Sequence, residues 1–280
     1  MNLKIISAIL VLTLASVACG FTVNLPYQSQ AGPQIKDSIT VADPKVEETR
    51  VSLSFGVGDL NVSTGAKNLV DGTVLYNVKD LKPAVTKNEG AIDIKQGDFE
   101  SLPPFEDLEN EWNLQLGKAP MDLAISAGAY KGNFELGGLS LKSLNISDGA
   151  SHVTVSFSKP NPVEMAEFRY TTGASDVTME GLANANFKTF VFNSGAGDYS
   201  LDFSGDLQQD ATVSIDSGLS NLTIIIPQNV NAIVTIDSTL ANVNFGEGWS
   251  QKGQIYSQKG AGPTLTIIIN MGAGDVNIRE

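Results

Sequence analysis

The sequence has little of the chemistry that most enzymes use. Among its 280 residues it contains a single cysteine, Cys19, and a single histidine, His152. A Ser-His-Asp triad would have to use His152, a Cys-His pair would need both residues, and a zinc site needs more such ligands than the chain offers. His152 lies in an alternating segment, where a solvent-facing or core position is expected rather than a ligand role. We therefore expect a protein that is not an enzyme and needs no cofactor.

Positive charge is also scarce. The chain has 18 lysines and arginines against 31 aspartates and glutamates, and its formal net charge is −13. A polyanion gains nothing from phosphate backbones, because it has no cations with which to release their counterions. Direct adsorption to anionic headgroups is discouraged for the same reason. The composition predicts no nucleic-acid partner and a well-solvated surface.

The one long apolar run lies near the N-terminus. Residues 5–15 are apolar or small, which is about half of the ~20 residues that span a bilayer, and Lys4 precedes them. This pattern predicts a signal peptide over residues 1–18. The run ends in Ala18-Cys19-Gly20, which resembles a lipobox, so Cys19 is the expected lipid attachment and its lipid the link to the membrane. Ordinary secretion is the alternative, because Ser16 and Ala18 also fit a small-x-small cleavage site.

Residues 19–48 follow as a predicted tether. They carry Pro26, Pro33 and Pro44 among polar residues, and no period of 2 or 3.6 is sustained. Such a segment is typical of a flexible coil that would lift the body away from headgroups.

The body consists of short β-like segments joined at glycine corners. Gly-x-Gly-Asp occurs three times, ending at Asp59, Asp198 and Asp275. Corner glycines repeat every 21–24 residues, at Gly128, Gly149, Gly173, Gly195 and Gly218. A period of this length indicates supersecondary units that stack on one another. We predict an all-β, stacked-strand β-solenoid over residues 121–280, capped by an irregular β subdomain over residues 49–120.

The C-terminal part departs from the repeat. An insertion at 246–262 interrupts the period, so residues 265–278 are expected to be the last rung of the stack. The pentapeptide Leu-Thr-Ile-Ile-Ile begins at Leu222 and again at Leu265, and this separation agrees with two repeats. Trp249, within the insertion, is a possible contact for a ligand or partner, or a plug that folds onto the last rungs.

The corner aspartates invite a second interpretation. Asp59, Asp198 and Asp275 could be calcium ligands, as in glycine-aspartate β-rolls, but those repeats recur about every 9 residues. Local satisfaction of turn amides is the favoured role of these side chains. Asp107 and Glu109, in a polar excursion over residues 97–111, could form a carboxylate pair, although acidic loops are usually only solvated.

Several segments, in order, resemble a known family. Residues 54–62, 72–78, 81–83, 110–116, 122–125 and 139–141 look like the toast-rack N-terminal domain, over about residues 49–245. The repeats also resemble adhesin-like repeat domains of unknown function and the extracytoplasmic half of LiaF-like envelope-stress proteins. The resemblance implies an all-β rack of stacked strands and an envelope location, and it supplies no catalytic residues.

These observations lead to one main hypothesis. The chain is predicted to be an exported lipoprotein on the outer face of the cell envelope, acting as an adhesin-like or envelope-sensing module for an unknown envelope or extracellular ligand. A structural, self-associating rod is the first alternative. A β-solenoid enzyme acting on polysaccharide is the second.

Overall fold

The computed structural model describes residues 31–98 and 107–280, and nearly all the regular secondary structure in these residues is strand. The predicted signal peptide and Cys19 lie outside the described residues. In chain order the strands are β1 (Ile35–Val41), β2 (Arg50–Thr64), β3 (Val70–Tyr76), β4 (Ala84–Asn88), β5 (Ala91–Lys95), β6 (Asn110–Leu116), β7 (Met121–Glu135), β8 (Leu141–Ser156), β9 (Met165–Glu180), β10 (Phe187–Asp202), β11 (Ala211–Ile225), β12 (Val230–Phe245), β13 (Ser250–Lys252), β14 (Ile255–Gln258) and β15 (Ala261–Arg279). Two short 3₁₀ helices, η1 (Lys79–Leu81) and η2 (Leu182–Ala185), complete them. Neither helix in this part of the chain has the length and apolarity needed to cross a membrane.

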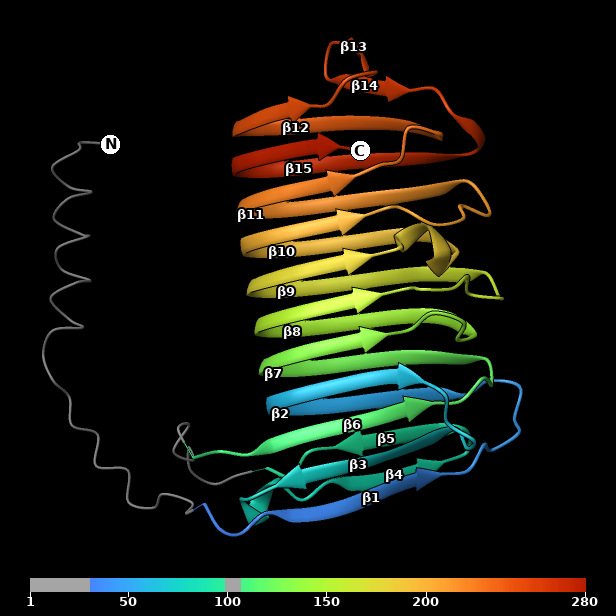
Figure 1. Cartoon of the computed structure of the whole chain (residues 1–280), viewed down its shortest axis with the longest axis vertical. Helices are drawn as coiled ribbons and strands as arrows, with labels where there is room; N and C mark the ends of the chain where they lie inside the picture. The colour runs from blue at the N-terminus through green and yellow to red at the C-terminus, as the bar shows by residue number, and fades with distance from the viewer. Residues whose placement is uncertain (1–30, 99–106) are drawn as a thin grey trace, which may run out of the picture.

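The long strands stack in parallel as bent rungs. Strands β2, β7, β8, β9, β10, β11, β15 and β12 follow one another in the sheet, and each passes through a corner that divides it into two legs (Figure 1). The predicted all-β stack of strands is confirmed. Because neighbouring strands lie about 4.8 Å apart, residues at the same position of successive rungs form rows along the stack.

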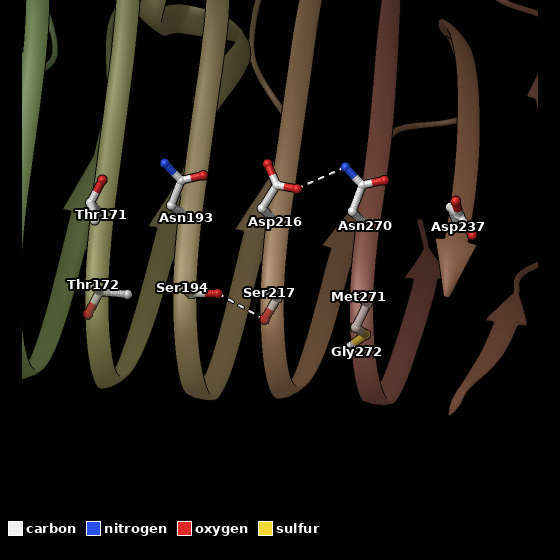
Figure 2. A pocket seen from close by; sticks show the side chains of 10 residues that line it. All are labelled: Thr171, Thr172, Asn193, Ser194, Asp216, Ser217, Asp237, Asn270, Met271 and Gly272. Carbon is white, nitrogen blue, oxygen red and sulfur yellow. Dashed lines mark hydrogen bonds between the residues drawn. The ribbon is translucent and has the colours of Figure 1, made fainter. Parts of the chain in front are cut away.

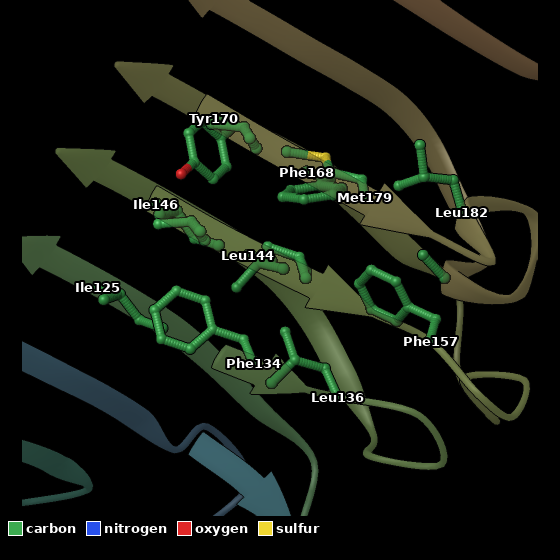
Figure 3. Packing of buried hydrophobic residues seen from close by; sticks show 14 of the residues in the cluster. Ile125, Phe134, Leu136, Leu144, Ile146, Phe157, Phe168, Tyr170, Met179 and Leu182 are labelled. Atoms are coloured by element: carbon green, nitrogen blue, oxygen red, sulfur yellow. The ribbon is translucent and has the colours of Figure 1, made fainter. Parts of the chain in front are cut away.

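The core lies between the two legs of each rung. In β10, Phe190 and Phe192 precede the corner and Tyr199 follows it, and all three are buried. Rings also stack from one rung to the next, with 4.4 Å between the centroids of Phe168 and Phe190. Figure 3 shows this packing for rungs β7 to β9. The alternation in the sequence thus marks the inward face of both legs.

The corners need glycine for two reasons. A Cβ added at Gly195 would lie 2.5 Å from the carbonyl oxygen of Gly173, on the rung below. Gly197 has a φ of +149°, and a Cβ there would lie 1.9 Å from the oxygen of Ser175. The first glycine of Gly-x-Gly-Asp therefore allows rungs to approach, and the second also supplies a backbone conformation that other residues avoid.

The N-terminal end contains one correction. Residues 35–41 were expected to belong to the tether, but they form β1, which pairs antiparallel with β3. Ile39 and Val41 are buried there, so the folded body begins before residue 49. Periodicity missed this strand because Asp37 interrupts the short apolar alternation of Ile35, Ile39 and Val41, and because its partner β3 lies beyond β2 in the chain.

The C-terminal end contains a second correction. Strand β15 is not the last rung, because it inserts in parallel between β11 and β12. The last rung is β12, and the insertion folds onto it as the β13–β14 hairpin. The repeated pentapeptide was also misleading: Leu222 pairs with Val276 after the corner, whereas Leu265 pairs with Ala211 before it.

Candidate functional site

A shallow groove of about 590 Å³ crosses five rungs beside the corner. We call it the ladder groove, and Figure 2 shows its side chains in two rows across the strands. Its lining consists of Thr171, Thr172, Asn193, Ser194, Asp216, Ser217, Asp237, Asn270, Met271 and Gly272. All but Met271 and Gly272 carry a polar side chain, so the groove is a polar surface rather than an apolar pocket.

The outer row follows the strand register. Thr171, Asn193, Asp216, Asn270 and Asp237 stand at matching positions of β9, β10, β11, β15 and β12. The amide of Asn270 donates to Asp216 Oδ1 over 2.8 Å. Because each step is one strand spacing of about 4.8 Å, the row offers hydrogen-bonding groups at a regular interval.

The inner row consists of three hydroxyls followed by Met271 on β15. Thr172, Ser194 and Ser217 occupy matching positions one residue nearer the corner. The hydroxyl of Ser194 donates to Ser217 Oγ over 2.9 Å, and Ser217 lies 2.7 Å from Ser220 Oγ. These bonds fix the hydroxyls before any ligand arrives, which lowers the ordering cost of binding.

The groove's chemistry is that of hydrogen bonding. Its charged side chains are Asp216 and Asp237, and the described residues lining it include no lysine, arginine, histidine or aromatic ring. The lining thus lacks a histidine or lysine that could activate its hydroxyls as nucleophiles. The arrangement suits a ligand with many hydroxyl or amide groups and no negative charge.

A buried carboxylate lies next to the groove, and sequence reasoning missed it. The hydroxyls of Tyr170 and Tyr130 donate to Asp148 Oδ2 over 2.6 and 3.2 Å, and Thr172 donates to Oδ1. Burial raises the pKa of both tyrosines, and the charge of Asp148 adds to the effect. The sequence contained a signal for this residue. Asp148 occupies the position next to the corner that Thr172, Ser194 and Ser217 occupy in later rungs.

The structure does not bring the three corner aspartates together. Asp59 lies on β2, several rungs from Asp198 on β10, and β11 separates Asp198 from Asp275. Asp198 and Asp275 accept hydrogen bonds from Asn221 and Asn242, at 2.6 and 3.0 Å. No group of three or more potential metal-binding side chains gathers in residues 31–98 and 107–280. The calcium interpretation finds no support in this geometry.

Trp249 packs at the end of the stack. Its ring lies 5.2 Å from that of Phe245, which stacks on Tyr256 of β14 at 3.8 Å. Trp249 is half-buried against the core rather than projecting freely. The insertion therefore adds two aromatic rings, Trp249 and Tyr256, next to Phe245 at the inner part of the last rung.

The other predicted polar residues lie on the surface. His152 is exposed on β8, with Nδ1 3.7 Å from Asp176 Oδ2. Glu109 accepts a hydrogen bond from Gln34, and Asp107 contributes its backbone oxygen to Asn77. None of these residues reaches the ladder groove.

Comparison with solved structures gives matches to several bacterial proteins. A proposed cell adhesion protein from Clostridium sporogenes shares 22% identity at a TM-score of 0.50, over 88% of this chain and 99% of that one. A proposed adhesin from Bacteroides fragilis matches at 9% identity and a TM-score of 0.35, over 89% and 99% of the two chains. A proposed lipid-binding protein from Parabacteroides distasonis matches at 10% and 0.37, over 90% and 99%. No curated protein matches the chain.

The family comparison covers most of the body. The model for the N-terminal domain of toast_rack, DUF2154, matches residues 30–165 and again 160–225. Together these matches extend from the residue before the described body to the end of β11 and include more than half of the chain. The chain therefore belongs to the toast-rack N-terminal domain family.

Proposed function

We propose that this protein is an exported, non-enzymatic, adhesin-like binding module that a lipid on Cys19 anchors to the outer face of the envelope. The ladder groove is its contact surface. The observation that carries the proposal is the row of amide, hydroxyl and carboxylate groups repeated on five successive rungs. The name of the Clostridium sporogenes structure agrees with an adhesive role.

The groove suits an extended, uncharged polysaccharide. A glycan presents hydroxyl and amide groups at intervals close to one strand spacing, so successive sugars can meet successive rungs. Asp216 and Asp237 accept hydrogen bonds from such a ligand and repel acidic sugars. The net charge of −13 adds to this discrimination. A ligand without hydrogen-bond donors would gain no binding energy from the carboxylates of Asp216 and Asp237.

A sedimentation assay with insoluble glycans tests the groove. The full-length chain should bind chitin and cellulose, which are uncharged, and it should not bind insoluble polygalacturonate, which is acidic. The double variant Asn193→Ala and Asn270→Ala should lose most of the bound fraction. A matched control, Asn221→Ala with Asn277→Ala, changes two amides on the other leg and should bind as the parent does. Equal loss in both variants, or no binding of either neutral glycan, would contradict the proposal.

Anchoring is tested separately. Cys19→Ala should release the protein from membranes without unfolding it, because the lipid is the proposed anchor and lies outside the body. The measurement is the membrane-bound fraction after a carbonate wash, with circular dichroism as the control for folding. A variant that stays with the membrane would disprove lipid anchoring while leaving the groove assay untouched.

A further inference from the structure

Exposed aliphatic side chains gather at one end of the molecule. Seven large hydrophobic residues of the described chain are exposed, and five of them lie on the last strands of the stack, β11, β15, β12 and β14. These five are Leu219, Ile233, Leu240, Ile255 and Ile268. Leu240, on the last rung, is 76% exposed. Such a concentration marks this end as a contact surface.

The last rung has a half-open edge. Strand β14 pairs with residues 232–235 of β12, and within the described residues no strand pairs with the outer edge of residues 240–245. Gly246 donates its N–H to Ile278 in β15. Because alternate residues of a strand point their backbone groups to opposite sides, those of Ala241, Val243 and Phe245 face the open edge.

This edge lacks the charged residues and prolines that protect many edge strands. Residues 240–245 (Leu-Ala-Asn-Val-Asn-Phe) contain no charge and no proline, although the chain carries a net charge of −13. Strands at the opposite end are different: β1 carries Lys36 and Asp37, and β4 carries Lys87. Charged residues of this kind keep edge strands from pairing with other chains. The neutral edge of β12 therefore allows two copies of an acidic chain to meet with less repulsion than a charged edge would.

We propose that the open edge of β12 pairs antiparallel with the same edge of a second copy of this chain. A two-fold axis through Val243 places Asn242 opposite Asn244 of the second copy and Ala241 opposite its Phe245. Apolar then meets apolar on the inner face, and amide meets amide on the outer face. In this register Val243 pairs with Val243 of the second copy, and Ala241 pairs with its Phe245. Both are hydrogen-bonded pairs, so every backbone group that faces the edge has a partner.

The hairpin sets the limits of this contact. Strands β14 and β13 project beyond β12 on the first leg, so two copies meet only along their second legs. One short leg gives a weak dimer in solution, because association costs offset most of the gain. Many copies on a surface raise the effective concentration and strengthen the contact.

The position of β12 in the fold determines how the two copies are oriented in the dimer. Strand β1 lies at one end of the stack and β12 near the other (Figure 1), so pairing at β12 places the two β1 strands at opposite ends of a double-length rod. If Cys19 carries the lipid, as the proposed function states, such a dimer joins two facing surfaces rather than two neighbours in one membrane. Self-pairing at the edge does not itself depend on the lipid or on the ladder groove.

Charge placed at the edge tests the pairing. The variant Asn242→Lys with Asn244→Lys sets lysines opposite lysines in the proposed dimer, where like charges destabilise pairing. The control, Asn221→Lys with Thr223→Lys on β11, introduces two lysines at the equivalent positions inside the stack. Asn242 and Asn221 each donate to a neighbouring aspartate, so their surroundings match.

Sedimentation equilibrium of the full-length chain, with Cys19→Ser to remove any lipid, should show a monomer–dimer equilibrium. The edge variant should raise the dimer Kd by about tenfold or more, and the control should leave it unchanged. A parent that stays monomeric up to about 1 mM, or an equal effect in both variants, would overturn the proposal. Glycan binding should be unchanged in the edge variant. Failure of the edge-pairing proposal can therefore be distinguished from failure of the ladder-groove assignment.

Cross-linking tests the register. Chains carrying Asn242→Cys and Asn244→Cys, each with Cys19→Ser, should form disulfide heterodimers when mixed, faster than either forms homodimers. These positions are a non-hydrogen-bonded pair in the proposed register, and their spacing suits a disulfide. A chain with Lys36→Cys, on β1, is the control and should not cross-link. Preferential homodimers, or no cross-link, would contradict the register centred on Val243.

Discussion

Replacing Gly195 by alanine should destabilise the stack, whereas the same change at Gly149 should be close to neutral. Both glycines lie at corners, and neither has a left-handed φ. A Cβ at Gly195 would lie 2.5 Å from the oxygen of Gly173, which is backbone of the next rung and cannot rotate away. At Gly149 the nearest atom, the oxygen of Gly128, is 3.3 Å away, so a small shift accommodates the methyl group.

The magnitude follows from two opposing effects. Alanine restricts the unfolded chain, which stabilises a protein by about 0.4–1 kcal/mol where the native site tolerates it. Forcing a methyl group into a closed site costs about 1–3 kcal/mol. The net change in unfolding free energy at Gly195 should therefore be a loss of about 1–2 kcal/mol. At Gly149 the two effects should cancel to within about 0.5 kcal/mol.

Urea unfolding followed by far-ultraviolet circular dichroism measures both changes through the midpoint at constant slope. For a body of this size a loss of 1 kcal/mol lowers the Tm by roughly 2–4 °C. Hydrogen exchange adds a local measurement, since rungs β9 and β10 should lose protection before β2 does. Equal destabilisation by the two variants would refute the argument that rung-to-rung approach fixes glycine at the corner.

Three further predictions follow from the site and its surroundings. Tyr170→Phe should lower the unfolding free energy by about 1.5–3 kcal/mol, because it removes a buried hydrogen bond to the charged Asp148. Urea unfolding measures this change, and a loss below about 0.5 kcal/mol would show that the hydrogen bonds around Asp148 contribute little. Stability should fall as pH rises above about 10, because the raised pKa values of Tyr130 and Tyr170 hold their protons in the folded state while the unfolded chain releases them. Ultraviolet titration at constant temperature should then show most tyrosinate forming only with unfolding, and early, reversible ionisation of these residues would contradict their burial. Chelation with EDTA should leave the Tm within about 2 °C, and a shift of ten degrees or so would restore Asp198 and Asp275 as ion ligands.

The sequence by itself determined the repeating unit. Strict alternation before and after each corner identified the buried face of both legs, because strand side chains alternate between faces regardless of which strand lies alongside. The sequence also predicted the glycine corners. A Cβ at Gly195 or Gly197 would collide with the nearest rung, and this depends only on the local bend and on that rung. The composition also indicated the polar, acidic character of the surface that the ladder groove displays.

Only the tertiary structure decided the order of the rungs. Nothing in the period of 21–24 residues says that β15 returns to lie between β11 and β12, because the connection through the β13–β14 hairpin is long enough to place the strand in either position. The same is true of β1, which needs β3 as its partner, and of Leu265, whose pentapeptide fits either leg. The ladder groove depends on that order because β15 places Asn270 between Asp216 and Asp237. The open edge at Val243 depends on it because β12, rather than β15, becomes the last rung.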